Sequence, residues 1–358
     1  MNESLLNALA RRPVPWLALA PAEATVAVCS RVRLARNLTG LPFPRRSTAP
    51  QRESVLTDVR RAAAPAFAPA ATLFAEMPEC AEVDRLVLLE RRLVSRELSQ
   101  SGAGSAVLVR TDESASIMVN EEDHLRIQAM LPGFCLRAAW QQADAVDSVL
   151  AASLTMAFTE ELGFLTACPT NLGTGMRASV MLHLPGLMLL GLIPGVVRAA
   201  EKLGLAVRGA YGEGTEATGN LFQVSNQSTL GESESEILER VERVVRQLIE
   251  NEKCARLRLV RRQRRRLYDH VGRAYGSLRH AYLLSSAEAL GWLSAVRLGV
   301  ELGLVASVGL AMIHELMIST QPGHLQKLAA KSLSSHERDA LRADVVRNRI
   351  RRGESGHP

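Results

Sequence analysis

The chain has 358 residues, enough for two domains, and its 47% apolar and 22% charged content is ordinary for a globular protein. Its net charge of +6, from 43 basic and 37 acidic residues, is only a mild excess. The five cysteines are dispersed and odd in number, which argues against a disulfide framework or a zinc site. We therefore expect a cytoplasmic protein without a signal peptide or a membrane-spanning segment.

The positive charge is uneven along the chain. Residues 253–273 hold nine lysines and arginines, seven of them between 256 and 266. This run is either a patch for nucleic acid or an acidic partner, or the solvated face of a helix. No aromatic residue interleaves with the arginines between 256 and 266, so we favour the helix face and consider nucleic acid an unlikely partner.

The first quarter of the chain predicts helix, strand and helix. Residues 1–24 predict a short helix followed by a connector rich in proline and alanine. Residues 25–34 alternate in character and predict a strand with Arg31 and Arg33 on one face. Residues 51–76 are rich in alanine and predict a helix that is interrupted near 65–69.

Residues 83–130 predict strands and turns, including a hairpin of 106–110 with 116–119 and a strand that carries Arg126 at 124–130. Helices and strands then follow one another up to residue 259. The pattern predicts a helix at 143–161, a strand at 177–183, a helix at 185–203, strands at 205–210 and 220–225, and a long amphipathic helix at 232–259.

Beyond residue 260 the pattern is helical only. We predict an α+β fold, with an antiparallel or mixed sheet flanked by helices and a C-terminal all-helical domain, because hairpins and loops join the strands as often as helices do. The expected boundaries are an N-terminal extension at 1–24, an α+β domain at 25–257, a helical domain at 258–351 and a polar tail at 352–358.

One ten-residue segment, from Cys168 to Arg177, combines a thiol, two glycines, hydroxyl groups and an arginine in the order CPTNLGTGMR. No packing rule requires that mixture, so it indicates a site. The chain has no GxxxxGK[ST] phosphate loop, and arginines on rigid strands are the obvious substitute because a guanidinium offers forked donors to phosphate. Five arginines lie on predicted strands, although each alone also fits a solvent-facing position: Arg31, Arg33, Arg126, Arg177 and Arg208.

Two acidic segments accompany these arginines, at 120–123 and 212–216. The first is also compatible with a charged turn, and the second with either a mobile lid or a hairpin turn. Cys168 is either a small buried hydrophobe or, among arginines, a thiolate. Together these features indicate a phosphoryl-transfer enzyme whose acceptor is positively charged.

Segments 30–37, 120–127 and 168–174 resemble the guanidino (phosphagen) kinases, the family of creatine and arginine kinases, over roughly residues 25–255. Within that family, segments 208–217 and 219–227 resemble the bacterial protein-arginine kinases. Residues 338–343 resemble that branch's phosphoarginine-binding motif. The helical domain at the C-terminal end of the chain also favours this branch.

The resemblance implies ATP and Mg²⁺ as cofactors and no metal held by the protein alone. Glu122 and Glu213 match the acids that hold and deprotonate the guanidinium, and Cys168 matches the substrate-side cysteine. The expected nucleotide-binding residues are Cys29, Ser30, Arg31, Val32, Arg33, Arg92, Arg126, Arg177, Ala178, Ser179, Val180, Met181, Arg208, Gly209, Ala210, Tyr211, Gly212 and Glu213. The expected allosteric phosphoarginine-binding residues are Arg338, Asp339, Ala340, Leu341, Arg342 and Ala343.

Two residues depart from the branch's usual pattern: Cys29 stands in place of a serine, and Arg92 in place of a nucleotide-contacting histidine. The resemblance implies protein substrates bearing arginine, a zinc-binding activator protein, a heat-shock repressor and a Clp-type AAA+ protease as partners. The apolar stripes of the helical domain favour a homodimer. Two alternatives stay open: a kinase of free arginine or another small guanidine, and a non-catalytic adaptor that binds phosphoarginine.

Overall fold

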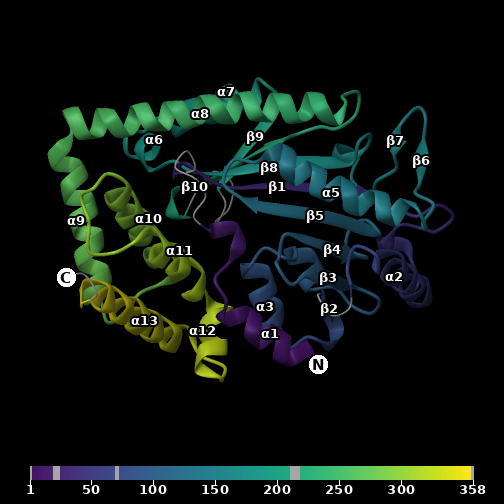
Figure 1. Cartoon of the computed structure of the whole chain (residues 1–358), viewed down its shortest axis with the longest axis horizontal. Helices are drawn as coiled ribbons and strands as arrows, with labels where there is room; N and C mark the ends of the chain where they lie inside the picture. Colours follow the sequence, from purple (N-terminus) through teal and green to yellow (C-terminus); the bar gives the residue numbers. More distant parts are fainter. Residues whose placement is uncertain (1, 19–24, 69–71, 210–217, 356–358) are drawn as a thin grey trace. The chain divides into compact units, whose positions relative to one another are not determined.

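The structure is a computed structural model that describes residues 2–18, 25–68, 72–209 and 218–355 (Figure 1). Eight strands form one sheet in the order β2-β3-β4-β5-β1-β8-β10-β9, and two short strands pair separately. The strand bounds are β1 (Ala27–Arg36), β2 (Thr72–Glu76), β3 (Ala106–Arg110), β4 (Ala115–Val119), β5 (Leu125–Pro132), β6 (Phe158–Thr159), β7 (Gly163–Phe164), β8 (Met176–His183), β9 (Leu205–Gly209) and β10 (Leu221–Asn226).

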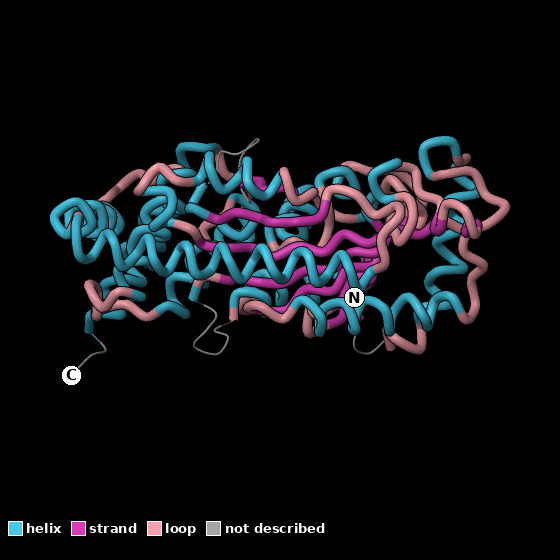
Figure 2. Tube along the Cα trace, turned by 90° about the horizontal axis from the view of Figure 1, so that it is seen from above, coloured by secondary structure: helices cyan, strands magenta, loops and turns pink. Residues whose placement is uncertain are grey.

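The pairings that lead from β2 through β3, β4 and β5 to β1 are all antiparallel, which confirms the expected sheet. Figure 2 shows the strands with helices lying against them. The helix bounds are α1 (Asn2–Arg11), α2 (Ala49–Ala63), α3 (Glu82–Glu90), α4 (Arg96–Ser99), α5 (Leu136–Ala151), α6 (Pro185–Leu189), α7 (Ile193–Glu201), α8 (Glu234–Arg262), α9 (Arg264–His280), α10 (Ser286–Glu301), α11 (Leu310–Ser319), α12 (Pro322–Ala329) and α13 (Ser335–Ser355).

The chain divides into two compact units. The first unit comprises Met1–Leu9, Cys29–Val180 and Ser225–Arg243, and the second comprises Ala10–Val28, Met181–Val224 and Val244–Pro358.

The first unit contains β2 to β5, most of β1 and β8, and helix α5. Helix α5 packs on β5 through an apolar stripe with helical spacing, formed by Leu136, Ala139, Ala143, Val146 and Leu150. A second apolar core lies between the outer strands and α3, where Leu73, Met118 and Leu88 are buried together. Both faces of this part of the sheet are therefore supported, which fixes the direction of side chains on its strands.

The second unit contains the C-terminal helices α9 to α13, which confirms the helical pattern expected after residue 260. Their core is made of apolar side chains such as Leu293, Leu316 and Val346. Helix α10 begins with a capping box, in which Ser285 and Glu288 satisfy each other's backbone N–H groups. Within the described residues, no helix has the length and apolar character needed to span a bilayer.

Four sequence-based predictions of secondary structure were wrong in part. Residues 72–76 form strand β2 and not helix, because Leu73 and Ala75 alternate with partly buried neighbours and share the buried face. Residues 82–90 form helix α3 and not strand, since a short apolar run such as 86–89 fits either state. The helix expected at 143–161 is α5, which begins at Leu136 and ends at Ala151.

The helix expected at 185–203 is in fact two helices, α6 and α7. Helix α6 ends at Leu189, and Gly191 then adopts the left-handed conformation with φ 68°. Pro194 lies in the first turn of α7, where its missing N–H costs nothing. The proline therefore marks a new helix rather than a kink in one long helix.

Candidate functional site

Strand β1 presents arginines on one face of the sheet. Arg31 and Arg33 are two residues apart, so they point to the same side. In the antiparallel register Arg33 lies opposite Gln128 and Ala35 lies opposite Arg126. Since directly opposed residues share a face, Arg126 extends on the same side of the sheet as Arg31 and Arg33.

Two further arginines join this face. Arg92 follows α3 in a left-handed conformation with φ 62°, and its carbonyl accepts a hydrogen bond of 2.8 Å from Gln128 Nε2. Arg177 lies on β8, the sheet neighbour of β1, and two residues later Ser179 Oγ donates to the carbonyl of Arg31 at 3.3 Å. We call these five side chains the cationic face: Arg31, Arg33, Arg92, Arg126 and Arg177.

The charges of the cationic face repel one another. Burial, followed by the charge of Arg92, lowers the pKa of Arg31 to about 10, and the charges of Arg126 and Arg177 act in the same direction. Burial, and then the charges of Arg31, Arg126 and Arg177, hold the pKa of Arg33 well below its usual value. Arg33 Nε is buried, and no group in the described part of the chain accepts a hydrogen bond from it. Guanidinium groups whose positive charges converge in this way form a site for a multiply charged anion.

The residues that alternate with these arginines face the other way. Ser30 Oγ is buried, where it donates to the carbonyl of Gly133 and accepts from the N–H of Cys135, both at 2.9 Å. Val32, Ala178 and Val180 are buried as well. Cys29 is also buried, but it is two residues before Arg31 and therefore lies on the same side of β1 as the arginines. The side chains of Ser30, Val32, Ala178 and Val180 therefore support the strands, and only their backbone is available to a ligand on the cationic face.

Carboxylates border the cationic face on the loop before β5. Arg126 pairs with Glu121 at 2.7 Å and with Glu122 at 3.5 Å. The side chain of Glu121 is buried and also accepts a hydrogen bond from Ser95, whereas Glu122 keeps about a third of its side chain exposed at 34%. Burial raises the pKa of Glu121, although the charge of Arg126 opposes that shift. Glu121 therefore orients Arg126, and Glu122 is the acid that solvent and ligands can reach.

A buried aspartate ties this acidic loop to the cysteine segment. Asp123 accepts hydrogen bonds from Asn37 Nδ2 at 2.6 Å and from the N–H of Ala167 at 2.7 Å. Asn37 also donates to the carbonyl of Leu165 at 3.0 Å. The end of β1, the acidic loop and the approach to Cys168 are thereby fastened together, so Glu122 and Cys168 belong to one arrangement in the first unit.

Cys168 itself is half-buried, and its Sγ lies 3.0 Å from Thr170 Oγ1. Two glycines after it are required by close backbone approaches. A Cβ on Gly173, whose φ is +104°, would lie 2.5 Å from the carbonyl oxygen of Thr229. A Cβ on Gly175, whose φ is +65°, would lie 2.6 Å from the carbonyl oxygen of Ala35.

Other expected site residues lie in the second unit or outside the described residues. Met181 is buried on β8, Arg208 is exposed on β9, and Gly209 ends that strand. The four residues Ala210, Tyr211, Gly212 and Glu213 fall outside the described residues, so the proposed lid and one of the two catalytic acids stay predictions.

The expected phosphoarginine motif lies on α13. Arg342 is buried, and it donates to the carbonyls of Thr320 and Leu284 and to Asp339 Oδ1. Arg338 donates to the carbonyl of Leu333 at 2.7 Å. Ala343 is buried, and Ala340 and Leu341 are partly exposed on the same helix. Arg342 thus acts as a brace between elements, and Arg338 and Asp339 are the more accessible members of the motif.

The sequence did not single out the residues that position these groups. Ser95, Gln128 and Asn37 act through side-chain hydrogen bonds to partners more than twenty residues away. No local spacing marks such contacts. The one signal was the polarity of Gln128 on a strand otherwise apolar in its buried positions.

Comparison with known proteins agrees with this geometry. Residues 60–255 match the family described as ATP:guanido phosphotransferase, C-terminal catalytic domain, and residues 264–357 match the protein-arginine kinase McsB C-terminal domain. Among solved structures, a duplicated taurocyamine kinase from Schistosoma mansoni superposes with a TM-score of 0.58 at 28% identity, over 66% of this chain and 35% of that one. A lombricine kinase shares the fold with a TM-score of 0.57 at 24% identity, over 68% of this chain and 70% of the other.

Curated relatives match nearly the whole chain. The protein-arginine kinase of Moorella thermoacetica is 48% identical over 335 residues, which cover 93% of this chain and 96% of that protein. The protein-arginine kinase of Brevibacillus brevis is 45% identical over 342 residues, which cover 95% of this chain and 96% of that one. Together with the sheet and its cationic face, these matches place the chain in the protein-arginine kinase branch of the ATP:guanido phosphotransferase family.

Proposed function

We propose that this protein transfers the γ-phosphoryl group of ATP to arginine side chains of proteins. The observation that carries the proposal is the cationic face, whose five arginines repel one another and whose Arg33 Nε has no acceptor in the described part of the chain. A triphosphate supplies the missing acceptors and negative charge. The names of the curated relatives support protein arginine as the acceptor.

ATP and Mg²⁺ are the cofactors we propose. The described residues contain no group of three His, Cys, Asp or Glu side chains suited to a metal ion. In this scheme the phosphates of ATP would hold Mg²⁺. When bound, Mg²⁺ would neutralise negative charge on the phosphoryl group that is transferred. The arginines of the cationic face hold the remaining phosphate oxygens.

The acceptor reacts on the carboxylate side of the site. A guanidinium is a poor nucleophile while protonated, so an acid must orient it and take one proton as the N–P bond forms and the bond from the γ-phosphorus to the ADP oxygen breaks. Glu122 is accessible and is fixed by Arg126, so we assign it to this cradle. We assign Glu213 and Cys168 to the same cradle from the resemblance.

The direct test is mass spectrometry of a model protein after incubation with MgATP, with non-acidic handling because phosphoarginine is acid-labile. We expect phosphorylation on arginine, and we expect Glu122→Gln to reduce the rate by about 10²–10⁴. Glu53→Gln is a control, because Glu53 is an exposed residue on α2. Label on free arginine alone would favour the small-guanidine kinase, and an unchanged rate in Glu122→Gln would remove that residue from the mechanism.

A separate proposal concerns α13, which we infer binds phosphoarginine through Arg338 and Asp339. These two side chains offer a guanidinium for the phosphate and a carboxylate for the remaining nitrogens. Arg338→Ala should abolish binding of a phosphoarginine peptide in calorimetry and leave the fold intact. Retained binding would contradict the assignment, and binding without any kinase activity would favour the adaptor function.

The remaining partners are proposals from the resemblance alone: a zinc-binding activator protein, a heat-shock repressor, a Clp-type AAA+ protease and a second copy of the chain. We also propose a cytoplasmic location, which the five free cysteines support.

A further inference from the structure

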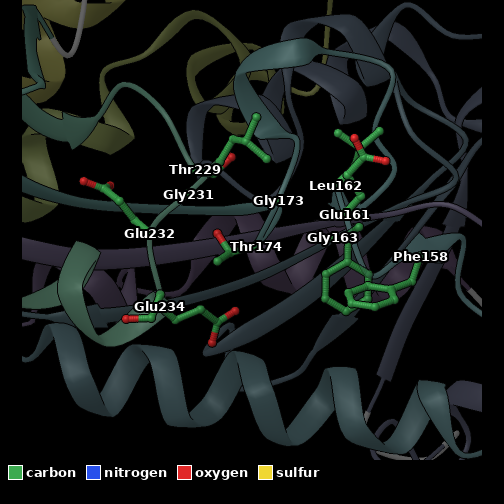
Figure 3. A pocket seen from close by; sticks show the side chains of 13 residues that line it. Phe158, Glu161, Leu162, Gly163, Gly173, Thr174, Thr229, Gly231, Glu232 and Glu234 are labelled. Carbon is green, nitrogen blue, oxygen red and sulfur yellow. The ribbon is translucent and has the colours of Figure 1, made fainter.

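A cavity of about 540 Å³ opens within the first unit beside the cysteine segment (Figure 3). Its walls come from the β6–β7 hairpin, from Gly173 and Thr174, and from residues 229–234 before and at the start of α8. Figure 3 shows Phe158 and Glu161 on one side and Glu232 and Glu234 on the other. The functions assigned above do not use this cavity.

The cavity shares backbone with the segment that begins at Cys168. Thr229 Oγ1 donates to the carbonyl of Leu172 at 2.6 Å, inside the segment that begins at Cys168. On the opposite wall, the N–H of Phe164 donates to the carbonyl of Gly173 at 2.8 Å. The chain runs from Phe164 directly to Ala167, whose N–H is held by Asp123. Its walls are therefore built from the same backbone that positions Cys168.

The lining carries negative charge only. Three of its thirteen residues are glutamates and none is lysine, arginine or histidine. Glu232 is already paired with Arg240, and Glu234 accepts a hydrogen bond of 2.7 Å from Trp140 Nε1. Glu161 is exposed and makes no ion pair within the described residues. The cavity therefore has carboxylate charge available for a cation.

The rim is apolar. Phe158, Leu162 and Leu230 are exposed by 55%, 37% and 50%. The ring of Phe158 meets that of Phe164 edge to face at 5.3 Å, and the guanidinium of Arg36 already lies 3.5 Å from the centre of the Phe164 ring. This aromatic pair thus holds one cation, and the exposed ring of Phe158 offers a similar surface to another. An apolar rim around carboxylates matches the aliphatic stem and charged end of lysine or arginine.

We propose that this cavity binds a basic side chain of the protein substrate, close in sequence to the arginine that is phosphorylated. The proposal rests on the function proposed above, and it adds a substrate preference to it. A protein substrate whose target arginine has a lysine or arginine neighbour fills both the cradle and the cavity, whereas free arginine fills the cradle alone. The cavity therefore favours basic segments of proteins over single guanidines.

The test compares synthetic peptides that contain one target arginine and carry lysine, glutamine or leucine at each flanking position in turn. We expect the wild-type protein to phosphorylate lysine peptides with a kcat/KM about tenfold higher at one or two positions, which corresponds to about 1.4 kcal/mol. Glu161→Gln should remove most of that preference, and Glu161→Lys should reverse it towards glutamate-bearing peptides. Turnover of the glutamine peptides should be the same in every variant.

Glu160→Gln is the matched control, because Glu160 is an exposed neighbour on the same hairpin and does not line the cavity. A second readout is fluorescence anisotropy of the same peptides with citrulline in place of the target arginine, which reports binding without chemistry. Equal affinity and equal kcat/KM for lysine, glutamine and leucine peptides would overturn the inference and leave the kinase function standing. A preference for leucine, or a lysine preference that Glu161→Gln leaves unchanged, would also overturn it. Failure of the kinase function would appear as lysine-dependent binding without phosphorylation of any peptide.

Discussion

Buried or half-buried arginines occur in both units, and the two groups differ in what surrounds them. In the second unit Arg256 pairs with Glu252 at 2.7 Å and with Glu301 at 2.8 Å, and Arg297 pairs with Glu301 at 3.0 Å. The positive charges of these two arginines are balanced by the negative charges of the two glutamates, and we call these four residues the balanced group. On the cationic face of the first unit, burial and neighbouring arginines both depress the pKa values of Arg31 and Arg33. Cys29 opposes the shift of Arg31, and Glu121 opposes that of Arg33, but each offsets only part of it.

The comparison separates two uses of the same side chain. A buried arginine that has its own carboxylate joins elements of the fold, and removing it leaves a buried charge without compensation. A group of half-buried arginines that repel one another is costly until an anion binds, so it is an indication of a ligand. The two groups should therefore respond to mutation in opposite ways.

The largest effect on stability is expected in the balanced group. Arg297→Met should lower the free energy of unfolding by about 3–5 kcal/mol, because Glu301 loses one partner and the carbonyl of Thr25 loses a donor. Urea unfolding measures this loss. The control is Arg273→Met, which breaks the exposed pair with Asp269 and should change stability by less than about 1 kcal/mol. Equal effects of the two substitutions would show that the balanced group is not structural.

A smaller effect, and on function only, is expected on the cationic face. Arg33→Met should reduce kcat/KM for ATP by about 10–100-fold. This range corresponds to the loss of one hydrogen bond to a charged group, which contributes about 1.5–3 kcal/mol. It should not lower stability, because it removes a charge that its neighbours repel. Steady-state kinetics and urea unfolding on one preparation check both statements. Destabilisation with normal ATP kinetics would reverse the assignment of Arg33.

The smallest effect is expected in the pH dependence of stability and concerns His314, which lies near Arg297 of the balanced group. Burial, and then the charge of Arg297, lower the pKa of His314 to about 4, whereas the unfolded chain titrates near 6.5. As pH falls from 6.5 to 4 the unfolded chain therefore binds a proton that the folded protein does not, and stability falls. His314→Gln should reduce this slope by about 1.4 kcal/mol per pH unit, and an identical slope would exclude His314 as a contributor.

Much of the fold was readable from local pattern. The alternation around Arg31 and the apolar stripe after residue 232 gave β1 and α8 their correct types. Residues 72–76 and 82–90 were misassigned because an alanine-rich or short apolar run has no decisive period, and the partner that decides lies elsewhere in the chain. Pairing of Thr72 with Arg110 in one ladder settles the first case.

The sequence predicted which residue types form the site, but it did not predict how they are arranged. Four arginines of the cationic face were expected because a phosphate needs forked donors, and the fifth, Arg92, was expected only from the resemblance. Arg208, which the same argument had included, lies on β9 in the second unit. The distinction between Glu121 and Glu122 was not predictable, because it depends on Ser95 and on burial by distant elements. The acidic cavity next to Thr174 was also invisible to the sequence, since three separate segments form it.

Gly175 also influences the position of Arg177 on β8. The N–H of Ala35 donates to its carbonyl at 2.9 Å, two residues before Arg177, so this contact helps to set how far Arg177 reaches along its neighbour strand. Even one methyl group there would collide with Ala35 and with the guanidinium of Arg36. Gly175, whose side chain is a single hydrogen atom, therefore helps to set the spacing between arginines on adjacent strands. That spacing in turn determines how well the arginines fit successive phosphate groups.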